Sequence, residues 1–227
     1  MTEEPGERID YQTPPLDGIG PELASSVRRL MDASVLTLAK ESELREVIEA
    51  LDKISEQLEG PNGSRLRAGT PWPPLEAMGK GDRPHNPVAG PANPLSPPLV
   101  VELCDDGSIT SEITMRPIHE GPPGGVHGGF VAALLDQLLG TANIVYGVGA
   151  MTGGLNIRYR RPTPIGVPLK LTARTDRIEG RKVFATGEIT ADGVVTAEAE
   201  GIFIRPTQDR LAQHREIAAT HHQPKAH

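Results

Sequence analysis

Apolar positions along the chain follow two different periods, and the change falls near residue 99. From Glu22 to Glu59 apolar residues recur every three or four positions without a glycine or proline, which is typical of an amphipathic helix. A polar patch at 40–42 leaves open whether this stretch is one long helix or two shorter ones. After residue 98 apolar and polar positions alternate, which indicates β-strands.

The strands predicted after residue 98 enclose a single apolar helix. Strands at 99–103 and 108–117 come first, a helix over about 129–146 follows, and alternating strands then occupy 151–162, 168–178, 182–191 and 194–204. Glu179-Gly180 and Asp192-Gly193 are typical of hairpin turns. This order predicts an α+β fold, in which a curved antiparallel sheet wraps around one buried helix.

These elements and the segments around them divide the chain into five predicted parts. Residues 1–20 are polar and are expected to be a disordered tail, and residues 21–59 form an N-terminal helical segment. Residues 60–98 are rich in proline and lack periodicity, which favours a linker, with Trp72 either an anchoring aromatic or part of a lid. Residues 99–206 form the main domain, and 207–227 are a C-terminal tail.

Charge and composition argue against several classes of function. The 227 residues carry a formal net charge of −7, which disfavours nucleic acid as the main partner. The single cysteine, Cys104, excludes an internal disulfide. No apolar run reaches about 18 residues and the first residues are acidic, so we expect no membrane span and a cytoplasmic protein. His85, His119 and the tail histidines have no metal-ligand spacing, and no metal or other cofactor is expected.

One carboxylate, Asp136, stands inside the apolar helix of the stretch GGVHGGFVAALLDQLLG, residues 124–140. A helix that is apolar on all sides is buried, and an unpaired buried carboxylate is costly. We therefore expect Asp136 to be a catalytic group whose pKa is raised toward neutrality, as a general base requires. The alternative is that Asp136 reaches solvent or caps a neighbouring element.

The glycines before this helix form a second candidate feature. The first amides of a helix have no internal partner and lie at the positive end of its dipole, so the Gly128 amide is suited to an oxyanion. Gly128 and Asp136 are eight residues apart, or about 12 Å along a helix. If both residues act on one small group, two copies of the helix must meet at a twofold axis, and the protein is at least a dimer.

The combination of His127-Gly128-Gly129 with Asp136, Thr152 and the strand motif LNIRYRRPTPIG resembles the hotdog-fold acyl-CoA thioesterases of the PaaI type. The resemblance covers about 99–206 and is closest to the subgroup of human thioesterase superfamily members four and five, which also have an EGRK-like hairpin. The N-terminal helical segment and the linker have no counterpart in it. It implies a hotdog fold, a homodimer or dimer of dimers, and hydrolysis of acyl-CoA thioesters.

The resemblance also implies roles for individual residues. Asp136 acts as general base or nucleophile, the Gly128 amide polarises the thioester carbonyl, and His127 shapes the site. Thr152 positions the water or the acid, which requires a β-bulge at Gly153-Gly154, because regular alternation puts Thr152 on the polar strand face. One departure is Gly121, which stands where several PaaI-type enzymes have a polar amide side chain.

Substrate contacts are expected from residues around the glycine turn and at two strand ends. Several are basic, and arginine geometry suits the phosphates of CoA, although a solvated surface explains most of these charges equally well. The expected substrate-binding residues are Gly129, Asn156, Arg158, Arg160, Arg181 and Lys182.

Two other functions fit parts of the pattern. A hotdog hydratase has a histidine shortly after its acid, whereas here no histidine follows Asp136 until His214. A non-catalytic acyl-CoA-binding or scaffold protein remains an alternative, with the N-terminal helix as a docking element. The presence of Asp136 favours an enzyme.

Overall fold

The computed structural model describes residues 11–60, 84–207 and 209–210. The helices and strands follow one another in the predicted order, apart from a short 3₁₀ turn before the apolar helix. Their bounds are α1 Ile19–Leu36, α2 Glu41–Glu59, β1 Glu102–Leu103, β2 Ile109–Thr114, η1 Pro117–His119, α4 Gly128–Val145, β3 Met151–Tyr159, β4 Pro168–Glu179, β5 Lys182–Ala191 and β6 Val194–Ile204.

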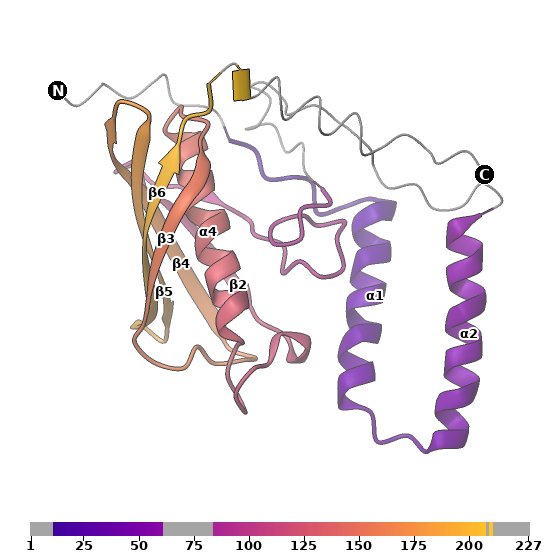
Figure 1. Ribbon diagram of the computed structural model, residues 1–227. Helices are drawn as coiled ribbons and strands as arrows, with labels where there is room; N and C mark the ends of the chain where they lie inside the picture. The colour runs from indigo at the N-terminus through magenta and orange to yellow at the C-terminus, as the bar shows by residue number, and fades with distance from the viewer. Residues whose placement is uncertain (1–10, 61–83, 208, 211–227) are drawn as a thin grey trace. The chain divides into compact units, whose positions relative to one another are not determined.

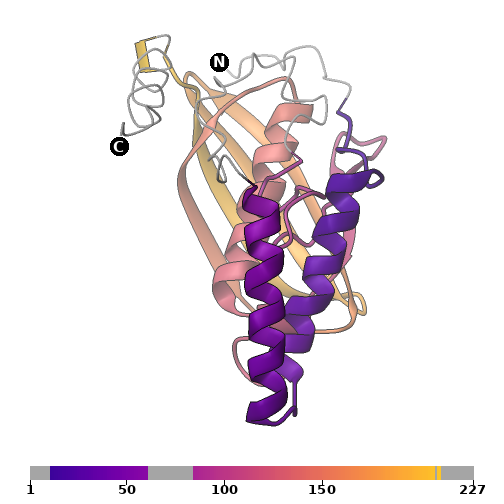
Figure 2. The same ribbon diagram turned by 90° about the vertical axis from the view of Figure 1, so that its right-hand side faces the viewer.

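The six strands form one antiparallel sheet in the order β1-β2-β4-β5-β6-β3. The predicted turns join β4 to β5 and β5 to β6, and Gly180, Asp192 and Gly193 have the positive φ angles that such turns require. The helix α4 lies along one face of the sheet (Figures 1 and 2). The predicted α+β hotdog fold is therefore confirmed.

The core lies between α4 and the sheet face that it covers. Alternation on β4 places Leu169 and Leu171 inside and Lys170 outside, as the period of two predicts. The other largest side chains of this core are almost fully buried as well. They are Leu99, Ile109, Met115, Leu134, Leu135, Leu138, Leu139, Ile189 and Phe203.

The apolar character of α4 follows from this packing. Among the described helices, α4 is the one long and apolar enough to cross a membrane, yet half of it is buried in the fold. One face of α4 stays half-buried or exposed within this chain, and its residues recur every three or four positions. Its members are Gly129, Ala132, Ala133, Asp136 and Gly140.

The N-terminal helical segment consists of two helices, with residues 37–40 between them. The sequence left this alternative open. Part of the segment expected to be a disordered tail has defined contacts: Thr13 accepts a hydrogen bond from the Val101 amide at 3.1 Å, and Pro14 is buried. Trp72 lies outside the described residues.

Candidate functional site

Asp136 lies in the middle of α4 and accepts a hydrogen bond of 2.7 Å from the Thr152 hydroxyl on β3. The predicted bulge makes this contact possible, because the pairing of β3 with β6 shifts register between Thr152 and Gly154. Asp136 is half-buried within this chain, at the edge of the core. The sheet covers the opposite side of α4, whereas the side that carries Asp136 is only partly covered within this chain.

The start of α4 presents a backbone amide without a partner. His127 is the residue before the helix, and its Nδ1 accepts a hydrogen bond from the Gly129 amide at 3.0 Å. The Phe130 and Val131 amides donate to the His127 carbonyl. For the Gly128 amide, no acceptor occurs among the residues that the structure describes. Gly128 N–H is therefore available to a ligand, as a helix N-terminus allows.

The turn before α4 is tightly closed around Gly121. A Cβ atom at Gly121 would lie 2.6 Å from the Cα atom of His127. The Gly121 amide also donates to the Gly125 carbonyl, and the Gly124 amide donates to the Glu120 carboxylate. The polar amide side chain of several PaaI-type enzymes has no space at Gly121 in this backbone.

The two halves of the predicted site are separated along α4 and lie at opposite ends of β3: Gly128 begins α4, whereas Asp136 lies in its middle. Tyr159, the last residue of β3, donates its hydroxyl to the Gly128 carbonyl at 3.0 Å. Thr152, near the start of β3, contacts Asp136 instead. Thr152 and Tyr159 are seven positions apart, or about 23 Å along an extended strand. Within one chain, a single thioester group cannot reach both the acid and the amide.

Asn156, Arg158 and Arg160 are not brought together with Asp136. They alternate with Leu155 and Ile157, the residues of β3 that pack against the core, and so they point to the other face of the sheet.

Both arginines already have carboxylate partners on that face. Arg158 lies 3.5 Å from Glu198, and Arg160 binds the same carboxylate. These arginines lower the pKa of Glu198, first of all through the hydrogen bond from Arg160. Arg158 also lies 3.9 Å from Glu200, so the two arginines face two carboxylates on the sheet surface.

The hairpin that carries Arg181 and Lys182 is at the Asp136 end of the sheet. Lys182 pairs with Ile204 of β6, and Ile204 in turn pairs with Met151 of β3, next to Thr152. The Arg181 side chain is exposed and donates to the Arg205 carbonyl. Of the four basic residues predicted to bind substrate, these two share an end of the sheet with the acid.

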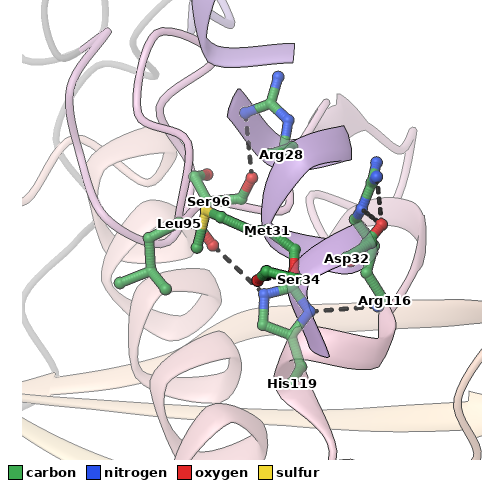
Figure 3. Close-up of polar contacts among 8 residues, drawn as sticks. All are labelled: Arg28, Met31, Asp32, Ser34, Leu95, Ser96, Arg116 and His119. Atoms are coloured by element: carbon green, nitrogen blue, oxygen red, sulfur yellow. Dashed lines mark hydrogen bonds and ion pairs between the residues drawn. The ribbon is translucent and has the colours of Figure 1, made fainter. Parts of the chain in front are cut away.

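A buried polar cluster lies between α1 and the turn before α4 and was not predicted from the sequence. His119, considered only as a metal ligand, is fully buried, and its ring stacks edge-on against Phe130 with centroids 4.7 Å apart. Arg28 and Asp32 of α1 belong to the same cluster (Figure 3). Arg28 and Asp32 are four residues apart, so they lie on the same side of an amphipathic helix. This spacing could have indicated a polar contact, but it is equally typical of an exposed polar face.

The described residues contain no group of three or more histidine, cysteine or acidic side chains that could hold a metal ion. The chemistry available on the α4 face is therefore that of a carboxylate, a hydroxyl and a backbone amide. A carboxylate of this kind takes a proton from water, and an amide at a helix start stabilises negative charge on oxygen.

Comparisons with known proteins connect this geometry to one family. The family model described as "Thioesterase superfamily" matches residues 123–206. Acyl-coenzyme A thioesterase THEM4 of Xenopus laevis is 36% identical over 91 residues, which cover 39% of this chain and 41% of that protein. Human acyl-coenzyme A thioesterase THEM5 is 31% identical over 88 residues, covering 38% and 36%. The match thus spans about two fifths of the length of these curated relatives.

A solved structure is similar over a much larger part of the chain. The crystal structure of a thioesterase superfamily protein is 36% identical, has a TM-score of 0.75, and covers 87% of this chain and 100% of its own. That share is larger than the part of the chain after residue 98, so the similarity includes N-terminal residues. The N-terminal region, which has no counterpart in the sequence motifs, therefore has one in this structure.

Proposed function

Because this chain belongs to the thioesterase superfamily, we propose that it hydrolyses the thioester bond of an acyl-CoA to a free acid and CoA. The hydrogen bond between Thr152 and Asp136 is the observation that supports this activity best. It orients a carboxylate on a face of α4 that is only partly covered within this chain. The curated relatives named as acyl-coenzyme A thioesterases supply the substrate class.

In the proposed reaction a water molecule attacks the thioester carbonyl carbon. Asp136 takes the proton from this water, and Thr152 holds the carboxylate in place through its hydroxyl. The carbonyl oxygen becomes negatively charged and accepts a hydrogen bond from the Gly128 amide. The C–S bond then breaks, the thiolate of CoA leaves and takes up a proton, and the acid is released. If Asp136 is instead the nucleophile, its oxygen attacks the same carbon and water cleaves the resulting anhydride.

The acid and the amide of one reaction are supplied by different subunits in this proposal. β3 is an edge strand, so its outer side has no strand partner among the described residues. A twofold axis through the middle of β3, between Leu155 and Asn156, would place Thr152 opposite the partner subunit's Tyr159. Asp136 would then approach the partner subunit's Gly128, across the small residues on the uncovered face of α4.

Thiol release from acyl-CoA esters tests the activity directly. We expect the full chain to release CoA from at least one member of a series of graded fatty acyl chains and aryl-CoAs, with the preferred member defining the acyl pocket. Hydrolysis of none of these esters, with CoA esters still bound, would identify a binding protein instead.

Mixing two inactive variants tests the shared site. Asp136→Asn removes the acid and Gly128→Pro removes the amide. In a mixed dimer, the acid of the Gly128→Pro subunit and the amide of the Asp136→Asn subunit form one complete site. After subunit exchange at equal amounts, we expect about a quarter of the wild-type specific activity, because half of the dimers are mixed and each has one working site. Rates are measured by thiol release before and after exchange.

The control mixes Asp136→Asn with the double variant that carries both changes, which leaves no complete site in any dimer. If the two single variants gain no activity over this control, while size and a label-transfer assay show that subunits have exchanged, each site is built within one chain.

A further inference from the structure

α1 is tied to the catalytic domain through a buried arginine. Arg28 is 8% exposed, and its Nη1 donates to the carbonyl oxygens of Pro91, Asn93 and Ser96 at 3.4, 2.9 and 3.3 Å. A buried guanidinium needs such acceptors, because its charge is otherwise poorly solvated. The turns at residues 84–98 are thereby held against α1.

The same turns contact α4 close to the candidate site. The side chain of Asn86 donates to that of Gln137, the residue that follows Asp136, at 3.0 Å. The Leu95 carbonyl faces Nε2 of His119 at 3.3 Å. Residues 84–98 therefore lie between α1 on one side and the turn and helix of the site on the other.

A second connection runs from α1 to the start of α4 through Arg116 and His119. The Asp32 carboxylate on α1 accepts a hydrogen bond from Nε of Arg116 at 2.7 Å and a further contact from its Nη2. The Arg116 amide donates to Nδ1 of His119 at 3.2 Å (Figure 3). The His119 carbonyl accepts the His127 amide at 2.8 Å. This amide is one peptide unit away from the unpaired Gly128 N–H.

We infer that His119 is a positioning residue: held by Asp32 and Arg116, it fixes the direction of the Gly128 amide through the backbone of His127. This inference rests on the proposed thioester hydrolysis, in which that amide binds the carbonyl oxygen. α1 is then part of the catalytic unit rather than an appendage. Its contribution is to transition-state geometry, because a displaced donor loses much of its effect on the developing oxyanion.

The partners of His119 define its protonation state. The Leu95 carbonyl can only accept, so Nε2 carries the hydrogen, and the Arg116 amide can only donate, so Nδ1 is unprotonated. Burial lowers the pKa of His119 from its usual value, and the Arg116 charge acts in the same direction, while the Leu95 carbonyl and Asp32 oppose them. The neutral ring that the contacts require is thus also the form that burial favours.

Three variants separate positioning from folding. His119→Phe keeps the ring and its contact with Phe130 but removes both nitrogens. His119→Asn restores an acceptor at the position of Nδ1, and Asp32→Asn weakens the link to Arg116 without changing shape. Glu22→Gln, the same kind of change at an exposed position of α1, is the matched control.

We expect His119→Phe to lower kcat for the best acyl-CoA about ten-fold or more with little change in KM, since ground-state binding does not use the displaced amide. His119→Asn should recover most of this loss, Asp32→Asn should give a smaller loss of the same kind, and Glu22→Gln should give none. Amide hydrogen exchange of the peptide over 120–131 is followed in parallel and should be faster wherever kcat falls.

The exchange measurement keeps this inference separable from the proposed function. If wild type hydrolyses no thioester but His119→Phe still accelerates exchange over 120–131, His119 does position this segment, and the proposed thioester hydrolysis is wrong. Folded His119→Phe and Asp32→Asn proteins with wild-type kcat and wild-type exchange would overturn the inference. A lower melting temperature with unchanged kcat would also overturn it, since the cluster would then be purely structural.

The pH dependence of stability provides a readout of the neutral ring. In the unfolded chain His119 takes up a proton as the pH falls through about 6.5, whereas the lowered pKa delays this in the folded protein. Stability from this residue is therefore complete above that pH and is lost on acidification. The charged groups facing the ring are Asp32 from α1 and Arg116 from the chain before η1, and the facing residue of α4 is Phe130. We expect the drop in melting temperature between pH 7.5 and 5.5 to be smaller in His119→Phe; an equal drop would contradict a neutral buried ring.

Discussion

Asp136→Asn should lower kcat for acyl-CoA hydrolysis by about 10²- to 10⁴-fold, the contribution expected of a positioned general base. Asparagine has nearly the same shape and its Oδ1 still accepts the Thr152 hydroxyl, so the contact between α4 and β3 is preserved. What is lost is the ability to take a proton from water. Thiol release under saturating substrate measures kcat, and circular dichroism shows that the variant is folded.

A distant carboxylate provides the comparison. Asp192 lies in the turn between β5 and β6 with a φ of 49°, a conformation that asparagine tolerates well, so Asp192→Asn removes a charge without strain. We expect this variant to have wild-type activity. Equal activity of wild type and Asp136→Asn would mean that Asp136 serves the packing of α4 on β3 and that another group activates the water.

Gly128→Pro should lower kcat by about 10²- to 10³-fold, the effect of losing one donor to an oxyanion. Proline removes the N–H and changes little else, because Gly128 is the first residue of α4, a position where proline is well tolerated. His127 already has the extended backbone that a following proline favours, with a φ of −59° and a ψ of 133°. The Tyr159 hydroxyl keeps its acceptor, the carbonyl of residue 128.

Gly128→Ala is the matched control for this substitution. It keeps the amide, and its Cβ atom would lie 3.6 Å from the Tyr159 ring, an ordinary van der Waals contact. We expect near-wild-type kcat from alanine and the full loss from proline. Equal effects of the two substitutions would show that space beside Tyr159 matters rather than the N–H.

Much of the domain could be predicted because its signals are local. The period-two strands, the two turn dipeptides and the apolar helix can each be predicted from neighbouring residues, and their order predicts an antiparallel sheet around one helix. The hotdog fold itself was implied by the family resemblance. The contact between Thr152 and Asp136 could be predicted only if β3 had a bulge that turned Thr152 toward α4. The glycines at 153 and 154 indicated where that bulge would lie.

Contacts that depend on pairing register or on distant backbone were not predictable. Arg158 and Arg160 resemble phosphate ligands until β6 is aligned with β3, which places Glu198 beside both of them. The partners of Arg28 are carbonyl groups more than sixty residues away, and carbonyl groups leave no trace in side-chain spacing. For the same reason the position of His119 beside α1 was missed.

The buried Arg28 has a consequence for shortened versions of this protein. The part of the chain that matches the family model begins at residue 123, yet β2, the buried Met115 and the partners of Arg28 all precede it. A fragment cut at that boundary would leave β4 as a bare edge strand, and one cut after α1 would strip three carbonyl groups of their donor. We therefore expect a stable fragment to begin before α1, well upstream of the His127-Gly128-Gly129 turn.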